Sequence, residues 1–141
     1  MHRMAEITDI HLVADENGSG KPHDYDGVPE GVEIFEINGP FFFGAADKFR
    51  ETIRTFKKKP KVLILRMSAV PAVDATAISA LERLIELAGK DRTRIVIAGI
   101  SKHVYQTLHR AGVVDLIGPE NILPDVHLAL ARSIILIEES L

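Results

Sequence analysis

The sequence predicts a single α/β domain, and three observations support this prediction. Short continuous apolar runs, such as VLILRM at residues 62–67, are typical of interior strands in a parallel sheet. Segments with apolar residues at a period of 3.6, as in amphipathic helices, separate these runs. Strands and helices therefore alternate along a chain of 141 residues, which predicts one sheet with crossover helices packed against it.

Composition excludes several classes of protein. With 46% hydrophobic and 26% charged residues, the chain resembles ordinary folded proteins rather than disordered ones. The net charge of −3 gives no electrostatic reason to expect nucleic acid as a partner. Cysteine is absent, so disulfides, a thiol nucleophile and thiolate metal ligands are excluded. No stretch reaches the roughly 20 apolar residues of a membrane-spanning helix, so this chain is expected to be soluble.

Two strands and a long loop are predicted in the first part of the chain. The strands are expected at residues 7–14 and 32–42, where apolar residues alternate with polar ones. The loop between them, residues 15–31, is rich in Gly, Pro and Asp and is either a functional excursion or a mobile segment. Its Gly20-Lys21 pair resembles a phosphate-binding loop, but Pro follows where that motif needs Ser or Thr.

A run of three phenylalanines, residues 41–43, joins the second strand to the first helix. That helix is expected at residues 44–59, with Phe49 on its apolar face and Glu51 and Arg54 on its polar face. Packing into the core is the favoured role for the aromatic run, and an exposed contact patch is the alternative. The helix ends in three lysines, which either complement the helix dipole or touch acidic lipid headgroups.

The second half of the chain repeats the strand and helix pattern with clear helix boundaries. Asp74 and Ser101 are suited to cap helices, and glycines follow both helices at positions 89 and 112. The expected elements are, in order, a strand at 62–67, a helix at 74–89, a strand at 94–99, a helix at 101–112, a short strand at 120–123 and a helix beginning near Val126.

No combination of residues points to catalysis. The six histidines lack metal-ligand spacing, and no serine triad, nucleophile elbow or carboxylate pair can be assembled. The chain is therefore not expected to be an enzyme, and no cofactor or metal is expected.

The start of the helix at Asp74 is the strongest candidate site. Thr76 lies in the first turn, where its hydroxyl is near unpaired backbone N–H groups. A phosphate on that hydroxyl would lie at the positive end of the helix dipole. Plain helix capping is the alternative, and local chemistry alone favours it.

Four segments together resemble a STAS domain, the module shared by SulP anion transporters and bacterial anti-sigma factor antagonists. They are INGPFFFGAADKF, VLILRMSAVPAVDATAISALERL, RIVIAGISKHVYQTLHRAGVVDLIG and RMAEIT. The aromatic junction and the RMAEIT segment are similar to the SulP branch. The resemblance implies a small mixed sheet with flanking helices at residues 7–141, and a linker at residues 1–6 that follows a membrane domain.

The resemblance also implies a function. The chain would be a non-catalytic regulatory and interaction domain of a SulP transporter for sulfate, bicarbonate or dicarboxylate-like anions, on the cytoplasmic side of the inner membrane. Its implied partners are its own membrane domain, a cytosolic protein and a second copy of itself.

The antagonist branch supplies the alternative, a free-standing antagonist switched by phosphorylation. Thr76 occupies the position of the serine that is phosphorylated there, whereas Ala77 replaces the glycine that usually follows it. In both cases, Asp74, Thr76 and Ala77 are the expected regulatory contact.

Overall fold

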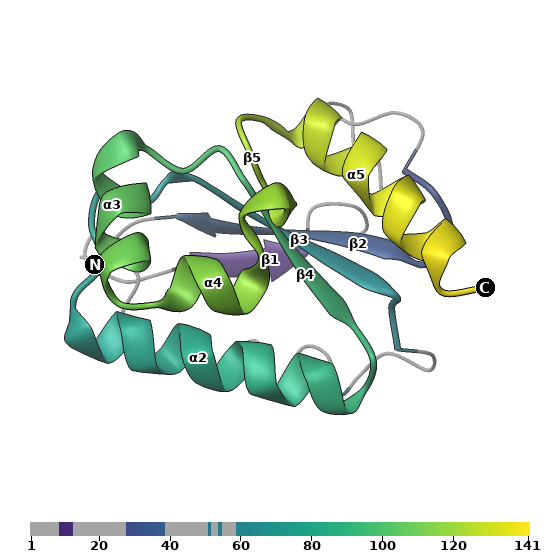
Figure 1. Ribbon diagram of the computed structural model, residues 1–141, viewed down its shortest axis with the longest axis horizontal. Coiled ribbons are helices and arrows are strands. Elements are labelled where there is room, and N and C mark those ends of the chain that lie inside the picture. Colours follow the sequence, from purple (N-terminus) through teal and green to yellow (C-terminus); the bar gives the residue numbers. More distant parts are fainter. Residues whose placement is uncertain (1–8, 13–27, 39–50, 52–53, 55–58) are drawn as a thin grey trace, which may run out of the picture.

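The computed structural model describes residues 9–12, 28–38, 51, 54 and 59–141, and in this part of the chain it contains one five-stranded sheet (Figure 1). The strand order follows the sequence, with β1 antiparallel to β2 and the other neighbours parallel. The strands are β1 (Asp9–Leu12), β2 (Val32–Asn38), β3 (Val62–Ala69), β4 (Arg94–Ala98) and β5 (Ile122–Leu123). The helices are α2 (Ala75–Lys90), α3 (Lys102–Arg110), α4 (Val113–Ile117), the 3-10 turn η2 (Pro119–Asn121) and α5 (Val126–Glu139).

The interior strands are buried on both faces, which explains their continuous apolar runs. Alternate side chains of a strand point to opposite faces. In β3, Leu63 and Leu65 pack in a core with α2, α3 and α4, whereas Val62 and Ile64 pack in a second core with α5. Figure 1 shows α2 and α5 on opposite sides of the sheet. The described elements therefore form three layers.

The predicted order of strands and helices is confirmed wherever the structure describes it. Strand β3 continues two residues past the predicted end at Met67, and the short strand before Pro124 is present as β5. Glu51 and Arg54 are helical and exposed, as expected for the polar face of the first helix. The predicted linker at 1–6, the aromatic run at 41–43 and Phe49 lie outside the described residues, as does most of the loop predicted at 15–31.

Two details of the helices differ from the prediction. Helix α3 ends at Arg110, and Gly112 then adopts a left-handed conformation with φ of 83°, from which the short helix α4 begins. The helical spacing of Ile78, Leu81, Ile85 and Ala88 predicts the apolar face of α2, and of these Leu81 and Ala88 are buried while Ile78 and Ile85 are partly buried against the same core. The residues of α2 that are buried are Ala77, Ala80, Leu81, Leu84 and Ala88. Small alanines let this helix lie close to the sheet.

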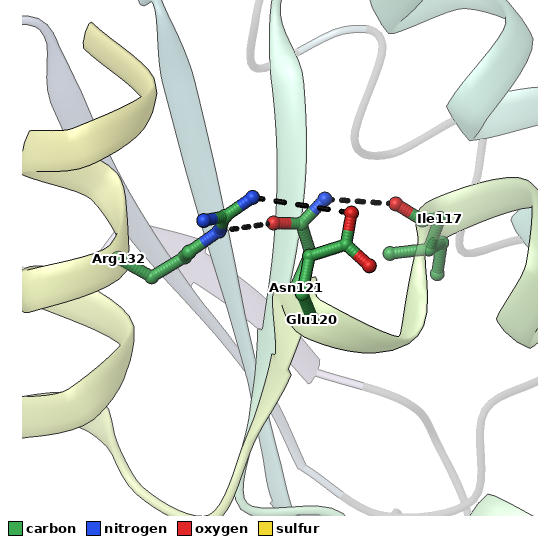
Figure 2. Close-up of polar contacts among 4 residues, drawn as sticks. All are labelled: Ile117, Glu120, Asn121 and Arg132. Atoms are coloured by element: carbon green, nitrogen blue, oxygen red, sulfur yellow. Dashed lines mark hydrogen bonds and ion pairs between the residues drawn. The ribbon is translucent and has the colours of Figure 1, made fainter. Parts of the chain in front are cut away.

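A buried amide joins α4 to α5 (Figure 2). The Asn121 side chain, only 1% exposed, donates from Nδ2 to the backbone oxygen of Ile117 at 2.9 Å. Its Oδ1 accepts from Nε of Arg132 at 2.7 Å. Glu120 lies 3.9 Å from the same guanidinium, but its side chain is 59% exposed. The amide therefore satisfies its hydrogen bonds within the fold while tying two layers together.

We expect Asn121→Ala to lower the free energy of unfolding by about 1–3 kcal/mol, because it leaves the oxygen of Ile117 and the Nε of Arg132 without their partner. Glu120→Ala is the matched control, and it should change stability by less than about 0.5 kcal/mol because its ion pair is exposed. Urea unfolding of both variants measures the difference. Equal midpoints would contradict a structural role for the amide.

Candidate functional site

The candidate site lies where the parallel strands end. Open α/β sheets usually place their binding sites at this carboxyl edge. Among the described helices, α2, α3 and α5 begin here (Figure 1). Each start is capped by a side-chain oxygen, from Asp74, Ser101 and Asp125 respectively. The carboxyl edge therefore combines three helix N-termini with side chains that already occupy some of their backbone donors.

Asp74 defines the start of α2. Its backbone is extended, with φ of −111° and ψ of −174°, and its Oδ1 accepts a hydrogen bond from the backbone N–H of Ala77 at 2.9 Å. The same oxygen accepts the hydroxyl proton of Thr76 at 2.7 Å. Asp74 and Thr76 are both exposed, whereas the methyl group of Ala77 is fully buried in the core. The three predicted residues are thus adjacent, with Asp74 and Thr76 facing outward and Ala77 serving as the anchor.

The hydrogen bonds to Asp74 stabilise its ionised form. The backbone N–H of Ala77 is the larger cause and the hydroxyl of Thr76 the next, and together they lower the pKa of Asp74 below its usual value of 3.8. A phosphate on Thr76 would remove the hydroxyl donor and place its own negative charge beside this carboxylate. Modification would therefore change the charge and the hydrogen bonds of an exposed helix start.

A small pocket of about 200 Å³ opens at the same edge, on the α5 face of the sheet. Arg66 and Ser68 of β3 line it together with Gly99, Asp125 and His127. Arg66 is paired with Glu36 of the neighbouring strand β2. Sequence reasoning did not single out this pocket, because its lining comes from three separate segments of the chain.

The part of the chain that the structure describes contains no group of three or more His, Cys, Asp or Glu placed to hold a metal ion. The histidines whose side chains are described, His103, His109 and His127, are all exposed. Within the same residues, none of the helices is both long enough and apolar enough to cross a membrane.

Comparisons of the sequence and of the structure with known proteins point to one family. The family model of the STAS domain matches residues 27–129. A sulfate transporter family protein from Wolinella succinogenes has a solved structure that is 39% identical, with a TM-score of 0.73, covering 88% of this chain and 97% of that one. The SulP transporter STAS domain of Vibrio cholerae is 34% identical, also with a TM-score of 0.73, covering 83% of this chain and 91% of that one.

Longer relatives match this chain over only part of their length. The protein named "Putative sulfate transporter YvdB" from Bacillus subtilis is 29% identical over 122 residues, covering 86% of this chain. This chain spans only 22% of that relative's length. An anti-sigma factor antagonist from Mycobacterium paratuberculosis shares the fold, with a TM-score of 0.64 at 15% identity, over 90% of this chain and 94% of that one. The expected mixed sheet with flanking helices is confirmed.

We expect the charge of Asp74 to stabilise the fold at neutral pH but not in acid. Because its pKa is lowered in the folded state, its contribution is present above the usual value of 3.8 and is lost as pH falls through the lowered value. Asp74→Asn keeps a good capping residue without the charge. The thermal midpoint of this variant should lie below that of the unmodified chain at about pH 7 and approach it at about pH 2. A gap that stays constant with pH would contradict the prediction.

Proposed function

This chain is a STAS domain, a member of a non-catalytic family, and on that premise we propose that it is a regulatory and interaction domain of a SulP-type secondary anion transporter. The anion would be sulfate, bicarbonate or a dicarboxylate-like species. The domain would lie on the cytoplasmic side of the inner membrane, with residues 1–6 as the linker from the membrane domain and residues 7–141 as the STAS domain.

One observation carries this proposal. The chain matches nearly all of two solved structures, a sulfate transporter family protein and a SulP transporter STAS domain, and only about a fifth of a protein named as a putative sulfate transporter. A module of this size therefore recurs within much longer proteins. The anion pathway would belong to the membrane domain, and this domain would act on transport through the contacts that it makes.

The start of α2 is the proposed regulatory contact. Asp74 and Thr76 are exposed and hydrogen-bonded to each other, so a partner can reach them without disturbing the core. Ala77 fixes the position of this helix start through its buried methyl group and through the hydrogen bond that its backbone N–H donates to Asp74. A phosphate on Thr76, which carries a charge of about −1.5 to −2 at neutral pH, would reverse the hydrogen-bonding character of the contact from donor to acceptor.

The second candidate function is a free-standing antagonist switched by phosphorylation at Thr76. The exposed hydroxyl in the first turn of α2 favours it, as does the fold shared with an anti-sigma factor antagonist. The encoding reading frame discriminates between the two functions. A long series of membrane spans before this domain supports the transporter, and a frame that encodes only this domain supports the antagonist.

We expect substitutions at Thr76 to change anion transport by the intact parent more than they change folding. Thr76→Glu should cost the domain less than about 1 kcal/mol, because the first turn of a helix accepts acidic residues. Thr76→Ala removes the hydroxyl without adding charge. Anion uptake by cells that express the parent, together with urea unfolding of the domain, gives the two readouts.

Thr107→Ala is the matched control, since Thr107 also lies on a helix and its hydroxyl donates to the backbone oxygen of His103 in its own helix. This control should leave uptake unchanged. If Thr76→Glu unfolds the domain while Thr76→Ala leaves uptake untouched, Thr76 is structural and the regulatory proposal fails.

A further inference from the structure

A second and larger pocket lies at the opposite, amino edge of the sheet. Its volume is about 570 Å³, and it is bounded by the segments that lead into β3 and β4 and by the end of α5. Figure 1 shows the last turn of α5 on the same side as the beginnings of these two strands. The residues that line it are Lys59, Pro60, Lys61, Asp91, Arg92, Arg94, Leu136 and Ser140.

Positive charge is concentrated in this pocket although the chain as a whole has a net charge of −3. Four of its lining side chains are cationic, and Asp91 is the single acidic one. Asp91 lies 4.0 Å from Lys59, and both side chains are about 40% exposed, so their attraction is weak. Within the described part of the chain, no ion pair engages Lys61, Arg92 or Arg94. These cations remain available to a ligand.

The backbone that carries the cations is held in place before any ligand arrives. The buried hydroxyl of Thr93 donates to the backbone oxygen of Pro60 at 2.7 Å, which ties one cationic loop to the other. The backbone N–H of Arg94 donates to the backbone oxygen of Lys61 at 2.9 Å. The backbone N–H of Lys61 donates in turn to the backbone oxygen of Gly31 at 2.8 Å. Such fixed geometry reduces the entropy lost on binding.

Arg92 adopts a backbone conformation that favours glycine. Its φ is 60°, in the left-handed region, and it is the second residue after the end of α2. Two hydrogen bonds close the helix there, from Arg92 to the oxygen of Gly89 and from Thr93 to the oxygen of Ala88. This bonding pattern usually has glycine at the left-handed position, because other L-residues are strained in it. An arginine at this position therefore costs stability, and strain of this kind is typical of functional sites.

We propose that this pocket binds an anion with several closely spaced phosphate groups. Arginine side chains form paired hydrogen bonds to phosphate oxygens, and lysines add charge at the same place. The four cations come from the two neighbouring segments that lead into β3 and β4, so they can contact more than one phosphate at a time. A soluble polyphosphate and the clustered headgroups of an acidic membrane share this chemistry. The proposal does not depend on any role of Thr76.

The test measures binding of the whole chain to two probes. Sodium tripolyphosphate represents the soluble source, and vesicles of mixed phosphatidylglycerol and phosphatidylcholine represent the membrane, with pure phosphatidylcholine vesicles as the blank. We expect binding to at least one probe, weakening as salt is added. Binding to tripolyphosphate alone identifies a soluble ligand and binding to the acidic vesicles alone identifies a lipid surface, and both results support the site. Binding to neither probe overturns the proposal.

A matched pair of double variants locates the binding. Arg92→Gly with Arg94→Gln should weaken it at least about tenfold, since several charge-assisted hydrogen bonds are lost. Arg83→Gln with Arg110→Gln changes the net charge equally, at exposed positions that do not line the pocket. This control should retain the affinity of the unmodified chain. An equal loss in both double variants shows attraction to the chain's overall charge and overturns the proposal.

The single variant Arg92→Gly separates binding from folding. Its thermal midpoint should be equal to or higher than that of the unmodified chain, because glycine adopts the left-handed conformation without strain, while its affinity for the probe should fall. If Arg92→Gly instead binds as tightly as the unmodified chain, the strained arginine has no part in binding and the proposal is overturned.

Discussion

The burial of β3 and β4 on both faces is the constraint on which the rest of this domain depends. Interior strands covered by helices on two sides leave little polar surface along most of their length, and the polar residues of β3, Arg66 and Ser68, lie toward its carboxyl end. Loops, helix starts and charged residues must then lie at its two ends. The candidate contact at Thr76 and the cationic pocket around Arg92 occupy these opposite ends. Polar chemistry is thus restricted to the edges because the faces are needed for folding.

The two edges of the sheet have opposite chemical character. At the carboxyl edge, Asp74 and Asp125 provide negative charge at the beginnings of α2 and α5. At the amino edge, the lining of the pocket is mainly cationic. Because the sheet separates them, a change of charge at one edge is screened from the other by distance and solvent. The two proposed sites therefore lie at different ends of the sheet, so that occupation of one does not block the other.

The sequence alone predicted those structural features that depend on a few neighbouring residues. The apolar run of β3 and the capping residue Asp74 were both recognisable, because each follows from a few neighbouring residues. Helix α4 was missed since five residues are too few to display a helical period. The cationic pocket was missed for a different reason: Lys61 and Arg94 come together only through the parallel pairing of β3 with β4. Whether Thr76 is a regulatory site depends on a partner, which no pattern in this chain describes.

The hydrogen bond between Arg132 and Asn121 affects how the domain opens. Helix α5 could be regarded as a separable last element, because it follows the short strand β5 and packs on its own face of the sheet. Its detachment would break a partly buried hydrogen bond and expose the apolar side chains of Val62, Ile64 and Val96 to water. Each of these side chains would lose about 1.5–3 kcal/mol of burial free energy. We therefore expect α5 to open together with the interior strands rather than to melt independently.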